Sequence, residues 1–337
     1  MDAQNRTARY WSRPVLQSVI PIVEESLHVR TSPDAVASVA SWMAYEEFGF
    51  PGGGVVEGLS LDTDPDHLMD LTMFETTLNF AFSDFDSGTK FAVVRNGRVY
   101  SDTEGMVICI QEAITRGVPI LDGEYLATVE RSDLETIFAG NIEMPMLDER
   151  VEILNEVGAA LVERYDGRFH RFVMDCAPAM YAGGDGILER LVTEFPRFND
   201  VSDYHGHEVQ IHKLGQLGLW MLHRALHGTG AWKLDDLTDM TAFADYIVPV
   251  GLNLMGILEY TDDLAGRIDG GEMIERDSDA EIEIRAHTLY ATALLTDALN
   301  AIRPSDRQLL IPEIDYRIWK TYHATFKPHH LTRTVMY

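Results

Sequence analysis

The sequence has little cysteine, and its cysteines follow no metal-binding pattern. Cys109 and Cys176 are the only two, and neither belongs to a CxxC or Cys/His spacing. This excludes a disulfide framework and the common structural zinc sites. His223 and His227 are four residues apart, a spacing that can bind a metal, but no third ligand accompanies them, so an ordinary helix face is favoured. We therefore expect no metal and no cofactor.

Basic residues are also scarce. Lysine and arginine number 27 against 54 acidic residues, which gives a formal net charge of −27. Binding of duplex nucleic acid needs clustered basic side chains, so this substrate class is excluded, whereas one local basic pocket can still hold a small anion. An acidic surface that is poor in lysine is typical of proteins hydrated in concentrated salt, so we expect a halophilic protein. The alternative is a merely acidic mesophilic protein.

No long apolar run occurs in the chain. No stretch approaches the ~20 apolar residues that a membrane span requires. The first eleven residues, MDAQNRTARYW, lack the apolar core of a signal peptide. We expect a cytoplasmic protein that has no contact with a membrane.

What the sequence does contain is helical periodicity, so we predict a mainly α protein. One further apolar segment, 241–258, contains Pro249, and proline favours the first turn of a helix. Ser132 and Glu135 have the spacing of a capping box before Ile137. The remaining predicted helices cover residues 33–47, 106–116, 148–165, 186–195, 212–227, 279–300 and 314–322.

One small β-sheet is predicted, around residues 73–100. The segment is aromatic and alternating, and Asn96-Gly97 is a strong signal for a two-residue hairpin turn. The connections along the chain are short, which favours a single domain over residues 1–337. An alternative divides it into an N-terminal lobe, 1–165, and a helical C-terminal lobe, 166–337. The triplet Gly52-Gly53-Gly54 lacks the spacing of a phosphate-binding loop.

Asp245 is the first candidate for chemistry. It lies in TAFADYIVP, inside an apolar stretch, and a carboxylate there is costly to bury unless it is paired or used. Because Pro249 indicates a helix start, Asp245 is expected near a helix N-terminus, where the helix dipole keeps it ionised. A capping or structural ion-pairing role is the alternative.

Lys213 is the second candidate. It is one of five lysines and stands at the start of an apolar helix rather than on an acidic face. An ammonium group in such a place suits a phosphate as a point-charge partner. A surface lysine that lays its stem on apolar neighbours is the alternative.

At these residues the chain resembles the queuosine salvage protein family. The resemblance rests on MTAFADYIVP, GLNLMGILEYTDDL, GGEMIERDSDAEIEIRA and PHHLTRTVMY, together with LNFAFSD, GVPILD and FPRFND upstream. These motifs follow in order from about Ser18 to Tyr337. Members of that family are similar in fold to helix-hairpin-helix DNA glycosylases and release the base queuine from queuosine 5′-phosphate.

The resemblance implies a hydrolase that acts on an N-glycosyl bond, with a small nucleotide as its partner. It implies that Asp245 is the catalytic aspartate and that Lys213 holds the substrate phosphate. The remaining substrate-binding positions that it implies are Phe243 and Tyr246 beside the sugar, Phe80 and Phe82 near the base, and Asn79, Arg285 and Tyr337.

Some positions depart from the family pattern. Ser83 and Met106-Val107 stand where the family usually has aromatic residues, and Ile247 stands where it usually has arginine. Two alternatives therefore stay open. The substrate is another 7-deazaguanine nucleotide, such as an archaeosine derivative, or the chain is a relative that binds a modified nucleotide without cleaving it.

Overall fold

A computed structural model describes residues 8–49 and 64–337; the glycine triplet 52–54 lies outside this range. The protein is mainly helical, as predicted, and carries small antiparallel sheets of two strands each. By their contacts, the residues divide into two compact units, each assembled from separate segments of the chain. Unit 1 comprises 1–50, 200–216 and 236–333, and unit 2 comprises 51–199, 217–235 and 334–337.

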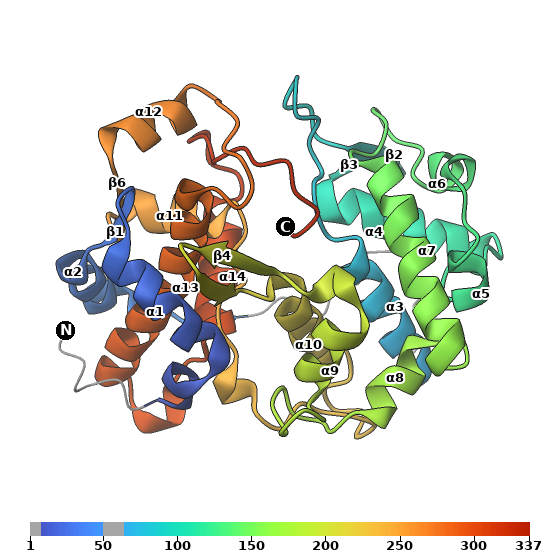
Figure 1. The fold of residues 1–337 in the computed structure, drawn as a ribbon, viewed down its shortest axis with the longest axis horizontal. Coiled ribbons are helices and arrows are strands. Elements are labelled where there is room, and N and C mark those ends of the chain that lie inside the picture. The colour runs from blue at the N-terminus through green and yellow to red at the C-terminus, as the bar shows by residue number, and fades with distance from the viewer. Residues whose placement is uncertain (1–7, 50–63) are drawn as a thin grey trace. The chain divides into compact units, whose positions relative to one another are not determined.

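Unit 1 is built around the long helix α13. This helix packs against α1, α2, α11 and α14 (Figure 1). The helices and strands of unit 1 are α1 (Pro14–Glu25), β1 (Val29–Thr31), α2 (Pro33–Met43), β4 (Val201–Tyr204), β5 (His207–Gln210), α11 (Val248–Leu254), β6 (Leu258–Tyr260), α12 (Asp262–Asp269), α13 (Asp279–Ile302) and α14 (Ile311–Tyr322), with short 3₁₀ turns at Arg9–Ser12, Leu237–Asp239 and Ser305–Arg307.

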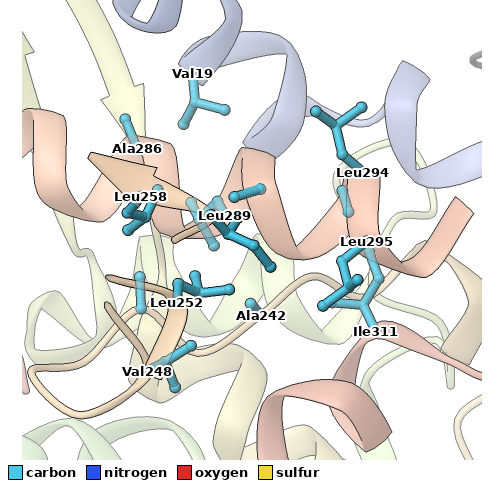
Figure 2. Close-up of a cluster of buried hydrophobic side chains, with 14 of the residues drawn as sticks. Val19, Ala242, Val248, Leu252, Leu258, Ala286, Leu289, Leu294, Leu295 and Ile311 are labelled. Carbon is cyan, nitrogen blue, oxygen red and sulfur yellow. The ribbon is translucent and has the colours of Figure 1, made fainter. Parts of the chain in front are cut away.

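Apolar side chains from these elements form one buried cluster. Figure 2 shows it, with α13 contributing Leu289 and Leu295 beside Leu252 of α11 and Ile311 of α14. Ala242, which belongs to no helix or strand, is also fully buried in this cluster. The core of unit 1 therefore anchors the segment that leads to Asp245, because burial of apolar side chains is the main stabilising contribution.

Unit 2 consists of shorter helices and one hairpin. Its elements are α3 (Pro65–Thr77), β2 (Ala92–Arg95), β3 (Arg98–Ser101), α4 (Asp102–Thr115), α5 (Gly123–Leu126), α6 (Arg131–Ile137), α7 (Leu147–Arg164), α8 (Phe169–Asp175), α9 (Ile187–Glu194) and a 3₁₀ turn at Pro196–Phe198. A further helix, α10 (Lys213–Ala225), begins in unit 1 and ends in unit 2. Among the described helices, none is both long and apolar enough to cross a membrane.

The hairpin prediction is confirmed, with one change of extent. β2 and β3 pair with Arg95 opposite Arg98, and Asn96 and Gly97 both adopt positive φ, as a type I′ turn requires. Residues 73–77, however, belong to α3 rather than to a sheet. The prediction of only one convincing sheet was wrong, because β1 pairs with β6 and β4 pairs with β5.

One predicted helix start is confirmed and another is corrected. Residues 241–247 are not helical, and α11 begins at Val248 with Pro249 in its first turn. The capping box of α6 is made by Glu130 and Asp133, whose side chain accepts from the Glu130 N–H at 2.9 Å, and not by Ser132 and Glu135. For α6 the local pattern was present, but the residues two positions earlier make the capping box.

A buried carboxylate on α13 fixes the turn between α1 and β1. Glu283 is fully buried and accepts hydrogen bonds from the backbone N–H groups of Leu27, His28 and Val29, at 3.0, 2.7 and 3.0 Å. The Tyr204 hydroxyl donates to the same carboxylate at 2.9 Å. One buried side chain thus satisfies three backbone donors and a hydroxyl donor.

We predict that Glu283→Ala lowers the free energy of unfolding by about 3 kcal/mol or more, because it leaves these donors without an acceptor. The measurement is urea unfolding followed by circular dichroism. Glu24→Ala, at an exposed position of α1, is the control and should change stability by less than ~0.5 kcal/mol. Equal stability of the two variants would contradict the role of Glu283.

Candidate active site

Asp245 lies immediately before α11 and is held there by the backbone. Its Oδ1 atom accepts hydrogen bonds from the N–H groups of Ile247, at 2.8 Å, and Val248, at 2.9 Å. The residue is 8% exposed. The predicted position near a helix start is therefore confirmed, although the N-cap of α11 is Ile247 and not Asp245. The hydrogen bonds to the backbone do not compete with chemistry here, because they fix the orientation of the carboxylate through one of its two oxygens.

Lys213 is the first residue of α10 and is only 5% exposed. The alternative of a solvated surface lysine was therefore wrong. Its backbone N–H donates to Oδ2 of Asp200 at 3.2 Å. Its charge acts on a second buried carboxyl group, that of Asp315, whose pKa is raised by burial and by Asp245 and is lowered only in small part by Lys213. Lys213 and Asp245 thus act electrostatically on one common neighbour.

A side-chain amide ties the first turn of α10 to the Asp245 segment. Gln216 is fully buried and accepts from the Thr241 N–H at 2.9 Å. Its Nε2 atom donates to Thr241 Oγ1 at 2.8 Å. Since both partners are buried, loss of either would leave unsatisfied polar atoms, so this pairing fixes the register between the two segments.

A buried ion pair makes the second connection. Arg285, on α13, donates to both oxygens of Asp200, at 2.9 and 2.6 Å, and its Nε donates to the Ala244 carbonyl at 3.2 Å. Burial raises the pKa of Asp200, but the charge and hydrogen bonds of Arg285 lower it by more, so it lies below its ordinary value. The structure therefore places Arg285 against the backbone beside Asp245. Its predicted contact with substrate stays a prediction.

Asp315, on α14, is a site residue that the sequence reasoning did not single out. Its Oδ2 accepts from the Phe243 N–H at 2.8 Å, and the residue is 4% exposed. Burial, and then the nearby charge of Asp245, raise its pKa well above the ordinary range, against smaller opposite effects of the Phe243 N–H and Lys213. Its sequence signal was an acidic residue in the apolar stripe of Ile311, Ile314 and Ile318.

Two aromatic residues flank Asp245 in the chain. Phe243 is buried, whereas Tyr246 is partly exposed, and its ring lies 4.5 Å from the ring of His329 between centroids. The next residue, His330, is buried, and burial together with the charges of His329 and Arg285 lowers its pKa to about 3. His330 is therefore neutral near pH 7 and adds no charge beside Arg285.

The remaining predicted site residues, Asn79, Phe80, Phe82 and Tyr337, belong to unit 2. Phe80 is 1% exposed, and the guanidinium carbons of Arg150 and Arg197 lie 4.1 and 4.7 Å from its ring centroid. The Asn79 side chain accepts from the Thr103 hydroxyl at 3.4 Å. Phe82 and Tyr337 are buried. Contact of these four with substrate stays a prediction.

Arg150, which sequence reasoning also missed, holds the loop that carries Phe80. Its guanidinium donates to the carbonyl groups of Leu78, at 2.7 Å, and Ala81, at 2.8 Å, and also to that of Phe80. Burial and the charge of Arg197 lower its pKa to about 9. Its signal was a basic residue on the buried stripe of α7, beside Ile153 and Leu154.

The other sequence candidate is the pair of His223, on α10, and His227, in the turn that follows this helix, and His223 has a structural partner. The His223 Nδ1 atom accepts from the Leu234 N–H at 3.0 Å, and its ring lies 6.2 Å from that of His227. Burial, followed by the charge of His227, lowers the pKa of His223. This arrangement suits a helix face packed on a following loop.

Unit 1 thus brings together Lys213, Phe243, Asp245, Tyr246 and Arg285. A fixed carboxylate stabilises positive charge that develops on a bound molecule, and an ammonium group binds an anion. In buried surroundings both effects are stronger than in water. The arrangement therefore suits a ligand that is anionic at one point and becomes cationic at another during reaction.

Comparison with known proteins identifies the family. The family model described as queuosine salvage protein matches residues 59–337. A protein of Sphaerobacter thermophilus is 32% identical, over 96% of this chain and 97% of its own length. Proteins of Schizosaccharomyces pombe and mouse are 27% and 28% identical, over 90% and 77% of this chain. All three relatives are named queuosine 5′-phosphate N-glycosylase/hydrolase.

The match covers both candidate residues, Asp245 and Lys213, and the relatives span most of the chain at similar length. This chain belongs to the queuosine salvage protein family.

Proposed function

We propose that this protein is a hydrolase that cleaves the N-glycosidic bond of queuosine 5′-phosphate and releases queuine. Its family and the names of its relatives support the reaction. The observation that carries the proposal for the site is the buried carboxylate of Asp245, fixed by two backbone N–H groups. Lys213 would supply the matching cation, since its charge and that of Asp245 both act on Asp315.

Asp245 would face the anomeric carbon of the ribose. As the bond from C1′ to the base nitrogen breaks, positive charge develops at C1′, and a preorganised carboxylate stabilises it. Water supplies a hydroxyl group to C1′ and a proton to the departing base, so the products are queuine and ribose 5-phosphate. A 7-deazapurine lacks N7, so protonation at that atom cannot assist its departure. More of the stabilisation of the transition state must therefore come from Asp245.

Lys213 would hold the 5′-phosphate as a point charge. Binding energy at the phosphate, remote from the bond that breaks, would position C1′ over the carboxylate. Phe243 and Tyr246 would flank the sugar, Phe80 and Phe82 would lie near the base, and Asn79, Arg285 and Tyr337 would complete the substrate contacts.

The proposal also covers the related fold, the class of substrate and the cellular location. We propose that the helical body is related to helix-hairpin-helix DNA glycosylases, which the family resemblance and the mainly helical architecture support. The net charge of −27 argues for a small nucleotide rather than duplex nucleic acid as the substrate. We also propose that the enzyme is cytoplasmic and needs no metal or cofactor.

The reaction is tested by incubating the protein with queuosine 5′-phosphate, queuosine and nucleotides of other 7-deazaguanine bases, with free base detected by mass spectrometry. We expect queuine from queuosine 5′-phosphate. Release only from another nucleotide would reassign the substrate. Saturable thermal stabilisation without any release would instead indicate a binding protein.

We predict that Asp245→Asn lowers kcat by ~1,000-fold or more, since the charge is removed while the amide oxygen can still cap Ile247 and Val248. Substrate affinity and melting temperature should stay close to those of wild type. Asp263→Asn, an exposed position on α12, is the matched control and should be fully active. Turnover by Asp245→Asn at the wild-type rate would overturn the assignment.

We predict that Lys213→Ala raises KM for the 5′-phosphate by ~10-fold or more and changes kcat/KM for the free nucleoside much less, because a hydrogen-bonded charge contributes ~1.5–3 kcal/mol. The readout is the ratio of kcat/KM for the two substrates. Lys320→Ala, exposed on α14, is the control. An equal loss for both substrates would remove the phosphate role.

A further inference from the structure

Asp315 acts on the Asp245 segment from a different helix. Phe243, whose N–H it accepts at 2.8 Å, precedes Asp245 by two residues, and Ala244 lies between them. Asp245 in turn accepts the N–H groups of Ile247 and Val248. The short stretch from Phe243 to Val248 is therefore held by a carboxyl group at each end.

The helix that carries Asp315 packs closely against α11. A Cβ atom added at Gly251 would lie 2.4 Å from Ile318 Cγ2 and 2.6 Å from Tyr322 Cδ2, both on α14. Contacts this short mean that the two helices pack backbone against side chain at Gly251. The Asp315 carboxyl group thus comes from a helix packed directly on α11.

Two buried carboxyl groups in electrostatic reach of each other cannot both ionise cheaply. Asp245 accepts two backbone N–H groups and Asp315 accepts one. The ionised carboxylate is therefore better stabilised at Asp245, and Asp315 is the carboxyl group that holds a proton. The raised pKa of Asp315, caused first by burial and then by Asp245, agrees.

The charges near Asp315 come from several elements of unit 1. Besides Asp245, Lys213 acts on it, in the opposite direction. Helix α11 carries no titratable side chain. On α13, the guanidinium of Arg285 is bound by Asp200, and on α14 that of Arg317 is bound by Glu46.

We propose that Asp315 is a positioning residue for Asp245: a neutral carboxylic acid that fixes the backbone at Phe243 without placing a second negative charge beside the carboxylate. This deepens the proposed function and rests on it for the catalytic readout. A protonated carboxyl group accepts the Phe243 N–H through Oδ2 and carries its proton on Oδ1. An amide of the same shape can do the same.

The first test compares Asp315→Asn with Asp315→Leu in the hydrolysis of queuosine 5′-phosphate. Asp315→Asn should keep kcat within about tenfold of wild type, because the hydrogen bond survives. Asp315→Leu should lower kcat by ~100-fold, as misplacement of a catalytic group does, with KM nearly unchanged. Asp315→Asn as inactive as Asp245→Asn would overturn the proposal, since the charge of Asp315 would then be required.

The second test measures stability against pH and needs no activity. A carboxyl group whose pKa is raised in the folded state holds its proton while the unfolded state has lost it, so wild type loses stability as pH rises above the unfolded pKa of ~3.9. Asp315→Asn cannot ionise. Its melting temperature relative to wild type should therefore rise between about pH 5 and about pH 8.

The two tests separate failure of the inference from failure of the proposed function. If wild type released no base, the relative stability of Asp315→Asn would still decide whether Asp315 is neutral. A relative melting temperature that stays constant or falls as pH rises would show an ionised or freely titrating Asp315 and overturn the proposal. If Asp315→Leu fails to fold, the Asp315→Asn variant still decides.

Discussion

The buried pair of Arg285 and Asp200 is the interaction on which the site depends. Asp200 receives the backbone N–H of Lys213, and Arg285 donates to the carbonyl of Ala244, next to Asp245. The pair therefore joins the start of α10 to the start of α11 across α13. Burial of an ion pair is costly, and it is tolerated here because both oxygens of Asp200 are bound and the guanidinium also reaches a backbone carbonyl.

The same pair explains why a further negative charge near Asp245 would be unfavourable. Glu281, fully buried one helical turn before Arg285, has its carboxylate 3.7 Å from the guanidinium. One arginine thus faces two acidic side chains, and Asp245 lies beyond the carbonyl that it binds. A neutral Asp315 keeps the backbone hydrogen bond at Phe243 without adding to this charge, which is the advantage of a carboxylic acid or an amide at that position.

The parts of the fold that the sequence predicted depend on local signals. Pro249 marked the start of α11, and Asn96-Gly97 marked the β2–β3 turn, because both act through their own backbone dihedrals. The β1–β6 sheet was missed because its strands, three residues each, lie more than two hundred residues apart in the chain. No pattern within a short window can report such a pairing.

The residues of the candidate site also divide into those that have a local sequence signal and those that have none. Asp245 and Lys213 stood out in the sequence because each is a charged residue in an apolar context, which is a local anomaly. Gln216, Asp200 and Asp315 were missed because their roles depend on which backbone atoms they meet, and these atoms belong to other segments. Arg150 is the same case in unit 2, where it binds carbonyl groups some seventy residues away.

The hydrogen bonds that fix the site are made mostly to the backbone, and this has a consequence for specificity. Thr241, Phe243 and Ala244 are each bound through a main-chain atom. The place of Asp245 is therefore set independently of the side chains that line the segment. In the proposed reaction, the carboxylate is therefore in place before substrate binds. A nucleoside that carries a 5′-phosphate can satisfy both charges at once, whereas one without it can satisfy only the first. In the proposed reaction, selection for the phosphorylated substrate would then follow from the second charge, which the free nucleoside leaves without a partner.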